Sequence, residues 1–216
     1  MNAPVDLPLT ERGARQAEVV AALSGLLPAH ALLYRREDTV PYECDGLTAY
    51  RALPLAVALP ETDAQVAAVL KACHALGVPV VARGAGTGLS GGAMPHTGGV
   101  TLSLAKFNRI LKLDVAARTA RVQCGVRNLA ISEAASPLGL YYAPDPSSQI
   151  ACTIGGNVAE NSGGVHCLKY GHIAADGAGD LAAGVGRVVQ PERRCRLADR
   201  QVAHAALHHC GSGQRV

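Results

Sequence analysis

Large aromatic side chains are scarce in this chain of 216 residues, which contains no tryptophan and a single phenylalanine. Charged residues make up only 17% of the sequence. Even so, glycine, proline or a charge interrupts every apolar stretch before it reaches the roughly 20 residues that a membrane-spanning helix needs. We therefore exclude a membrane-spanning protein. The first residues also lack a basic segment followed by an apolar one, which argues against secretory export and favours the cytoplasm.

An excess of charge of one sign is missing too. Twenty basic and seventeen acidic residues give a formal net charge of +3, and the basic residues before position 172 are scattered, so nucleic acid is not an expected partner. The seven cysteines form no CxxC pair, which favours reduced, mostly buried thiols, with Cys73 and Cys124 as core residues. Glycine, by contrast, is abundant, with 24 residues, and it is concentrated in two segments, where we expect the function to reside.

The order of expected elements predicts an α+β domain rather than a regularly wound sheet. Hydrophobic spacing predicts a helix over residues 10–27 with Thr10 as its cap and Pro28 as its stop, and another over 128–135. A further helix is expected between a Thr62–Gln65 capping box and a left-handed Gly77. Strands are expected at residues 55–59, 78–81, 100–104, 110–113 and 119–124, the last two joined by a hairpin connection at 115–118.

One βαβ unit follows from this order. The expected strands at 55–59 and 78–81 lie on either side of the helix that begins after Thr62. We predict that the two strands form a parallel pair with a right-handed crossover.

The first glycine-rich segment follows the expected strand at 78–81. A run of small residues after a strand lets backbone N–H groups turn toward one point, which makes a concave site for an anion, most often phosphate. We interpret the segment as a pyrophosphate cradle, to which Arg83 adds charge and Thr87 or Ser90 adds a hydroxyl donor; a bare surface loop is the alternative. The candidate residues are Arg83, Gly84, Ala85, Gly86, Thr87, Gly88 and Ser90.

Two common phosphate-binding motifs fit this segment poorly. No Gly-Lys-Ser/Thr follows, so the Walker motif is absent. Residues 86–91 match GxGxxG, but a dinucleotide fold then needs a helix and an acidic residue about 20 positions on. Pro95 and the glycines at positions 91–99 preclude that helix, and the first acidic residue after the loop is Asp114. The Rossmann alternative is therefore disfavoured.

The second segment extends from Ala143 to His166. Two prolines fix an extended start, Thr153 can cap a short helix whose N–H groups face an anion or a polar ring edge, and paired glycines let a flat ligand approach the backbone. Asp145 and Glu160 are the acidic residues near the two segments, and we favour a structural role for Asp145 over a general base. The candidate residues are Pro144, Asp145, Ser148, Thr153, Gly155, Gly156, Asn157, Gly163, Gly164 and Val165.

Three stretches carry a family resemblance: Arg83–Gly92, Pro144–Ser148 and Thr153–Asn157. Together they closely resemble the FAD-binding domain of the vanillyl-alcohol oxidase and p-cresol methylhydroxylase type. Within that superfamily, Asn161–Gly171 is similar to the flavoprotein subunit of bacterial glycolate oxidase and to related D-lactate dehydrogenases. The resemblance covers about residues 15–171. It implies a two-lobed FAD-binding domain whose second lobe is incomplete, with the diphosphate on the first segment and the flavin ring near the second.

The resemblance also implies a function. Several relatives attach the flavin to a loop histidine, and Thr87 stands at that place, so FAD is expected to bind non-covalently. The implied reaction is oxidation of a small 2-hydroxy acid such as glycolate or D-lactate, with electrons passing to a second subunit or a quinone. Such partners imply peripheral association with the inner membrane. The family's catalytic histidines lie beyond the resembling part, so we assign no catalytic residue or metal and expect the chain itself to be inactive. A non-catalytic nucleotide-binding module or an inactive truncated product is the alternative.

We divide the chain into an N-terminal helical segment (1–50), a truncated FAD-binding domain (51–171) and a tail (172–216). The tail has six arginines, no lysine and no aromatic residue. This composition is typical of a shifted reading frame in GC-rich DNA, which we favour over a poorly ordered native tail, and we expect nothing in it to replace missing strands. A metal cluster of His204, His208, His209 and Cys210 is disfavoured. His166 and Cys167 either contact the ring or form a packed or solvated pair.

Overall fold

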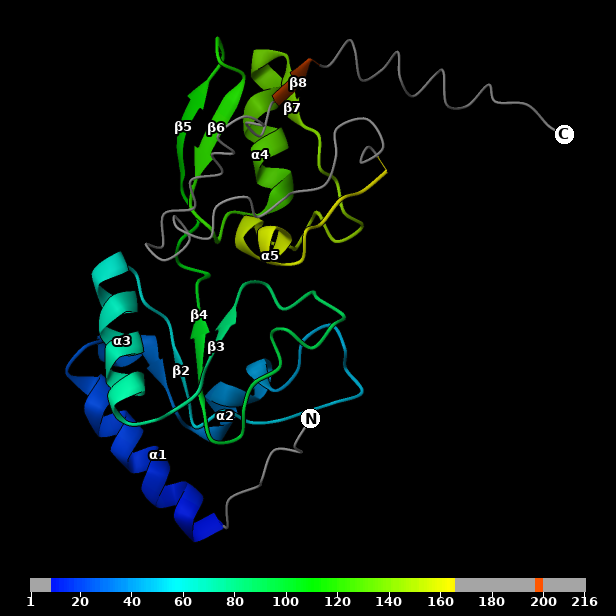
Figure 1. Cartoon of the computed structure of the whole chain (residues 1–216). Coiled ribbons are helices and arrows are strands. Elements are labelled where there is room, and N and C mark those ends of the chain that lie inside the picture. Colours follow the sequence, from blue (N-terminus) through cyan, green and yellow to red (C-terminus); the bar gives the residue numbers. More distant parts are fainter. Residues whose placement is uncertain (1–8, 166–196, 200–216) are drawn as a thin grey trace, which may run out of the picture. The chain divides into compact units, whose positions relative to one another are not determined.

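The computed structural model describes residues 9–165 and 197–199, and these form two compact units. Unit 1 comprises the described residues up to Phe107, and unit 2 comprises those from Asn108 onward. Both combine helices with short strands (Figure 1), which confirms the α+β expectation. Within the described part of the chain, no helix is long and apolar enough to cross a membrane.

Unit 1 is built on a four-stranded sheet in the order β1–β2–β4–β3. β1 (Leu32–Leu33) is antiparallel to β2 (Ala56–Ala58), whereas β2 and β3 (Val80–Arg83) both run parallel to β4 (Val100–Ser103). The strands at 55–59 and 78–81 therefore run in the same direction, as predicted, but they do not form a hydrogen-bonded pair, because β4 lies between them. All four residues of β4 are buried, as expected for a central strand that is covered on both faces.

Helix α3 (Asp63–Ala75) connects β2 to β3 and begins as the sequence predicts. The Gln65 backbone N donates to Thr62 Oγ1 at 3.2 Å, and the Thr62 backbone N donates to Gln65 Oε1 at 3.2 Å. These reciprocal hydrogen bonds are the expected capping box. Gly77 follows the helix with φ +63°, a left-handed conformation that terminates it.

The predicted core thiols are buried in both units. Cys73 is 1% exposed in unit 1, and burial raises the pKa of its thiol. Cys124 and Cys152 are buried in unit 2, and Cys44 is half-buried. The expectation of mostly buried thiols is confirmed for the four cysteines that the structure describes.

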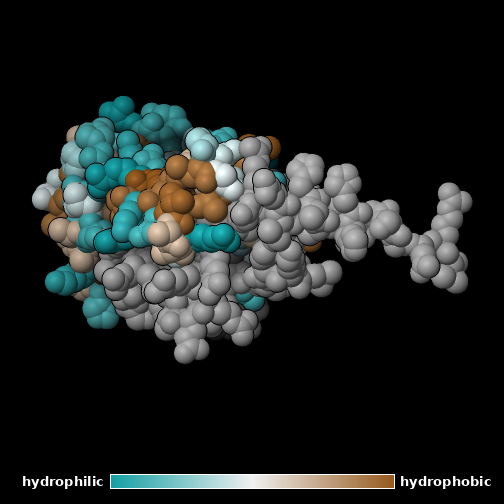
Figure 2. Space-filling view, turned by 90° about the horizontal axis from the view of Figure 1, so that it is seen from above, coloured by the Kyte–Doolittle hydropathy of each residue, from teal (hydrophilic) through white to brown (hydrophobic). Residues whose placement is uncertain are grey.

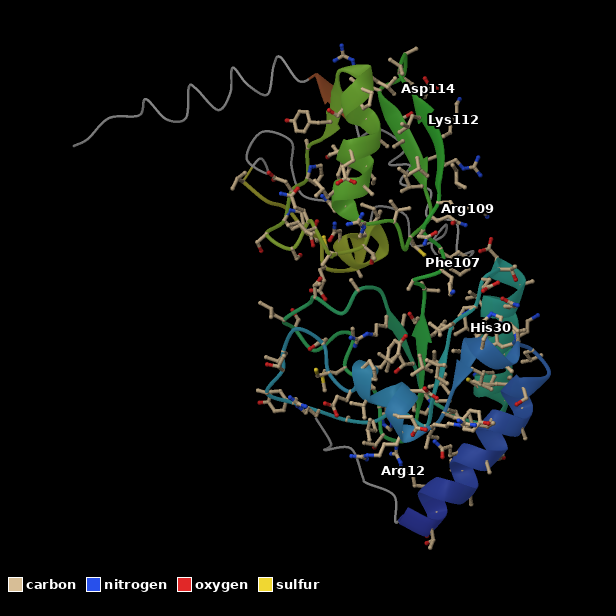
Figure 3. All side chains as sticks on the ribbon, turned by 180° about the vertical axis from the view of Figure 1, so that it is seen from behind. Arg12, His30, Phe107, Arg109, Lys112 and Asp114 are labelled. Atoms are coloured by element: carbon tan, nitrogen blue, oxygen red, sulfur yellow. The ribbon has the colours of Figure 1, made fainter. Side chains whose placement is uncertain are left out.

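Helix α1 (Leu9–Ser24) packs against α3, β1 and β2. Arg12 fixes it to the rest of unit 1 (Figure 3) by donating to the carbonyls of Thr97 at 2.6 Å, Leu53 at 2.8 Å and Pro54 at 3.1 Å. Side chain to backbone hydrogen bonds thus join α1 to two chain segments that lie beyond position 50.

Both ends of α1 differ from the prediction. Thr10 lies inside the first turn and is not the cap, and the helix ends at Ser24, four residues before Pro28. The reason for the early end is local: Gly25 follows at once, and glycine loses more backbone entropy in a helix than any other residue. The remaining short elements of this region are η1 (Ala29–Ala31), α2 (Arg36–Thr39) and η2 (Val40–Tyr42).

Unit 2 combines a hairpin, two helices and a short strand. β5 (Ile110–Asp114) and β6 (Thr119–Val122) form the expected antiparallel hairpin, and α4 (Asn128–Ala135) matches its predicted bounds. β7 (Leu140–Tyr142) packs against α4, and α5 (Ile154–Ala159) lies within the second segment. The shared core consists of Val122, Val126, Ile131, Ala135, Leu140, Tyr142, Ile154 and Val158.

One part of the tail joins this unit. β7 pairs antiparallel with β8 (Leu197–Asp199), with Tyr141 opposite Ala198. We expected nothing in the tail to replace missing strands, yet these three residues do supply one short strand. Residues 166–196 and 200–216 lie outside the described residues, and with them His166, Cys167 and the disfavoured metal cluster.

Unit 2 also exposes large hydrophobic side chains, among them Leu111 in β5, Val115 in the hairpin turn and Leu138 in η3 (Ser136–Leu138). Figure 2 shows hydrophobic residues gathered between hydrophilic ones on one face of the molecule. A two-stranded sheet is marginally stable alone, and exposed apolar surface is typical of a place where further protein packs. These features fit the expectation of an incomplete second lobe.

Candidate functional site

The first segment, Arg83–Ser90, leaves the carboxyl end of β3 without forming a helix. Turns and bends continue from it to β4 at Val100. A Rossmann dinucleotide site needs a helix at this point, so the structure excludes that alternative.

Arg83 shapes the first segment from within. Its side chain is buried, and Nη1 donates to the carbonyls of Cys44 at 2.7 Å and Ala93 at 3.4 Å. The guanidinium also lies 5.6 Å from the centre of the Tyr42 ring. Arg83 thus joins three parts of the chain around the loop, a role that the sequence did not indicate.

Two glycines let the backbone approach closely here. Gly86 has φ +71°, and a Cβ at this position would overlap the Arg83 guanidinium. A Cβ at Gly46 would lie 2.7 Å from the Gly88 carbonyl oxygen and 2.8 Å from that of Thr87. The segment around residue 46 therefore lies directly against the glycine loop, and this contact requires glycine at 46. Glycine at 86 is favoured instead by its left-handed backbone and by the neighbouring Arg83 guanidinium.

Asp45 is an acidic residue at this loop that the sequence analysis missed. Its side chain is 4% exposed; Oδ1 accepts a hydrogen bond from the Leu47 backbone N at 2.8 Å, whereas Oδ2 has no hydrogen-bond partner among the described residues. Its neighbours Cys44 and Gly46 both contact the first segment. No short-range pattern links Asp45 to a loop about forty residues later in the sequence.

The second segment, Pro144–Val165, lies in unit 2, and its start and end meet. Gly164 has φ +151°, and a Cβ there would overlap both the side chain and the carbonyl group of Asp145. The structure therefore brings together two predicted site residues that are separated in sequence. Glycine at 164 is required because the backbone has no room for a side chain.

The middle of the second segment is held by the backbone that precedes α4. The Gly155 N donates to the Cys124 carbonyl at 2.7 Å, and the Ile154 N donates to the Val126 carbonyl at 2.9 Å. A Cβ at Gly155 would lie only 3.0 Å from the Cys124 Cβ. These contacts fix the first turn of α5 and explain the first glycine of the Gly155–Gly156 pair.

Thr153 occupies the cap position of α5 but does not cap it with its side chain. No cap hydrogen bond forms, which corrects that prediction, and its buried Oγ1 lacks a hydrogen-bond partner within the described structure. A Cβ at Gly156 would lie 3.6 Å from this hydroxyl oxygen. A buried hydroxyl without a partner costs free energy, so this group suits a polar atom of a ligand.

Asn157 belongs to a buried amide pair. Its Nδ2 donates to Asn128 Oδ1 at 2.8 Å, and Asn128 Nδ2 donates to the Pro144 carbonyl at 2.9 Å. The sequence analysis placed Asn157 at the site but missed Asn128, which lies outside both glycine-rich segments. An asparagine at the start of a helix gave no sign of this contact.

The predicted site residues thus form two groups, one in each unit. The group in unit 1 surrounds the Arg83–Gly86 contact, and the group in unit 2 surrounds α5 and the Asp145–Gly164 contact. Ala85, Ser90 and Val165 are exposed, whereas the other candidates are buried or half-buried. No cluster of metal-ligating side chains occurs in the residues described.

Comparison with known proteins settles the family. Residues 54–177 match the model of the family described as FAD binding domain. The chain belongs to this FAD-binding family. Glycolate oxidase subunit GlcD of Escherichia coli K12 is 62% identical over 156 residues, which are 72% of this chain and 31% of that protein. D-lactate dehydrogenase of Anaerostipes hadrus is 42% identical over 121 residues, 56% of this chain and 25% of that protein. The chain spans about a third of the length of the curated relatives it matches.

Solved structures agree on the fold. p-Cresol methylhydroxylase with substrate bound has a TM-score of 0.58 and 26% identity, covering 64% of this chain and 28% of that one. Alkyldihydroxyacetonephosphate synthase has a TM-score of 0.65 at 22% identity, covering 73% of this chain and 34% of that one. The expected p-cresol methylhydroxylase type of FAD-binding fold is confirmed.

The residues of this FAD-binding domain fit its cofactor. The first segment offers a loop of small residues beside the Arg83 guanidinium, which a Cβ at Gly86 would overlap, and a run of small residues next to a cation suits an anion. The second offers closely packed glycines and, beside Gly156, the Thr153 hydroxyl, which has no hydrogen-bond partner in the part of the chain that the structure describes; both suit a flat, polar-edged ring.

Proposed function

We propose that this chain is the FAD-binding part of a flavin-dependent oxidoreductase for a small 2-hydroxy acid, such as glycolate or D-lactate. The carrying observation is the glycine cradle, which lies in a stretch 62% identical to a glycolate oxidase subunit. D-lactate dehydrogenases at 40–42% identity extend the substrate class beyond glycolate. The complete enzyme would require parts that lie outside the matched third of the relatives.

In this proposal the two segments bind different parts of FAD. Backbone N–H groups of the first segment and the Thr87 hydroxyl bind the diphosphate, with Arg83 and Gly86 holding the loop open. Thr153, Gly156, Asn157 and the Gly163–Val165 stretch contact the flavin ring. The bound flavin supplies the acceptor for the hydride equivalent that leaves the substrate, and this chain binds and orients it. Thr87 cannot form a histidyl-flavin bond, so attachment is non-covalent.

Partners and location follow from the same relatives. The bacterial relative is named as a subunit, which supports an assembly in which electrons pass to a second subunit or a quinone. Peripheral association with the inner membrane would then occur through those partners.

FAD titration of the purified 216-residue chain tests the proposal. Because the matched part is incomplete, we expect a colourless preparation that quenches the fluorescence of added FAD at high concentration, and no turnover of glycolate or D-lactate. Acid precipitation should leave all flavin in the supernatant, since the bond is non-covalent. Absence of any saturable quenching would contradict the proposed cofactor site, and flavin retained in the pellet would contradict non-covalent binding.

The tail needs a separate test. We propose that residues 172–216 derive from a shifted reading frame, and translation of the coding DNA in its other two frames decides this. We expect one frame to continue after Gly171 with strand-like sequence similar to the relatives. Failure of both frames to do so would favour a native tail that includes β8.

A further inference from the structure

Asn128, the first residue of α4, is fully buried and bonds to three points of the second segment. Its backbone N donates to the Cys152 carbonyl at 3.0 Å. Its side-chain Nδ2 donates to the Pro144 carbonyl at 2.9 Å, and its Oδ1 accepts from Asn157 Nδ2 at 2.8 Å. One residue outside the segment therefore connects the start, the middle and the helix of that segment.

Burial of the Asn128 side chain costs free energy unless its hydrogen bonds compensate for the lost hydration. Burying an amide is unfavourable without partners, and a well-packed apolar side chain would serve a purely hydrophobic core better. Neighbouring positions of the same helix, Ile131 and Ala135, are apolar and buried. Asn128 instead makes both of its side-chain hydrogen bonds to residues of the second segment.

The network also fixes the orientation of both amides. The Pro144 carbonyl can only accept, so Asn128 must direct its NH₂ group to it and its oxygen to Asn157. Asn157 must then direct its own NH₂ group to Asn128. The Oδ1 of Asn157 is consequently left as an acceptor whose direction is set from Pro144 through Asn128.

We propose that Asn128 is a positioning residue of the cofactor site, and that it holds Asn157 Oδ1 as an acceptor for a donor group of bound FAD. FAD offers two donors near its ring, the ring N–H and the ribityl hydroxyls. This inference rests on the proposed function, because it assumes that the second segment receives the flavin.

The test measures FAD affinity, flavin reduction potential and unfolding midpoint for the full chain and its variants. Asn128→Leu should weaken FAD binding about tenfold to a hundredfold, the cost of unpaired buried polar groups. Asn128→Asp should also weaken FAD binding, because it keeps the acceptor for Asn157 but places a buried carboxyl group, instead of a donor, against the Pro144 carbonyl. The double variant Asn128→Leu, Asn157→Leu should have the same FAD affinity as the single variant that binds FAD more weakly, since the two residues act as one unit.

Ser132→Ala is the matched control. Ser132 lies one turn further along α4, where its Oγ accepts from the Tyr142 N at 3.2 Å and donates to the Tyr142 carbonyl at 3.4 Å. This variant removes hydrogen bonds between α4 and β7 without touching the second segment. It should lower the unfolding midpoint and leave the FAD affinity and potential unchanged.

The outcomes identify the donor group of FAD and separate the positioning role of Asn128 from the proposed function. A potential shift in both Asn128→Asp and Asn157→Leu supports the ring N–H as the donor, and loss of affinity at constant potential supports a ribityl hydroxyl. If the Asn128 variants bind FAD as tightly as Ser132→Ala does, the positioning role is overturned while the proposed function stands. If the unmodified chain binds no FAD, the proposed function fails and this inference fails with it.

Discussion

The two glycine-rich segments are supported in different ways. The first is held by one of its own residues, Arg83, whose side chain reaches the carbonyls of Cys44 and Ala93. The second is held from outside, by backbone bonds from Cys124 and Val126 and by the Asn128 amide. Both segments can be recognised from their own residues. The support of the second cannot, because its partners lie some thirty positions upstream.

Gly86→Val should have the largest effect on the first segment. The branched side chain would overlap the Arg83 guanidinium, and the left-handed backbone costs about 1–2 kcal/mol for a non-glycine residue. FAD titration should show no detectable binding. Gly91→Val is the control: φ there is +78°, but the nearest atom to a Cβ, Met94 Cγ, is 3.8 Å away. Equal FAD affinities in the two variants would remove Gly86 from the site.

Gly164→Ala tests the second segment in the same way. The new Cβ would push against Asp145, so we expect FAD binding to weaken about tenfold or more, from a strain of at least 1–2 kcal/mol. Gly139→Ala in the same unit has φ +72° and nothing within 4 Å, and should lower only the unfolding midpoint. An FAD affinity as high as that of Gly139→Ala would show that the Asp145 contact does not shape the site.

Variants of Arg83 distinguish an electrostatic role of this residue from a structural one. Arg83→Ala removes two hydrogen bonds and the Tyr42 contact, so unfolding in urea should report a loss of about 1–3 kcal/mol, together with weaker FAD binding. Arg83→Lys keeps the charge but not the forked geometry, and we expect it to rescue little. Restoration by lysine, or recovery of Arg83→Ala at low salt, would instead indicate that Arg83 acts on the phosphates by charge.

The smallest effect is expected away from both segments. Thr62→Ala removes the capping box of α3 and should cost about 1 kcal/mol in the free energy of unfolding, measured by urea titration. FAD affinity should not change, because α3 contributes no candidate site residue. A parallel loss of FAD binding would mean that the first segment depends on the whole of unit 1 rather than on its own contacts.

Local signals were sufficient for much of the fold and for the segments themselves. The capping box at Thr62, the left-handed Gly77, the hairpin at 115–118 and the bounds of α4 each depend on residues within a few positions of one another. The candidate site residues were found because small residues at close spacing have a direct physical meaning. The motifs therefore identified the segments without showing how each one is supported.

Long-range contacts account for what the sequence could not provide. Strand order is decided by which strand is buried on both faces, and nothing near Val80 indicates that β4 lies between β2 and β3. Asp45 and Asn128 reach the segments only through the folded chain. Thr153 sits at a cap position by pattern, yet its hydroxyl does not cap the helix, because the α5 backbone is already bonded to Cys124 and Val126.

The central place of β4 has a consequence for how the chain acquires its structure during synthesis. Residues 56–58 and 80–83 leave the ribosome before their shared neighbour at 100–103. Until the whole glycine loop has been made, β3 therefore has no strand partner and β2 has only β1. Non-local pairing of this kind is slow, and the waiting strands are exposed to aggregation. The loop is therefore closed in the same step that completes the sheet, and a nascent chain stopped before residue 100 would have neither.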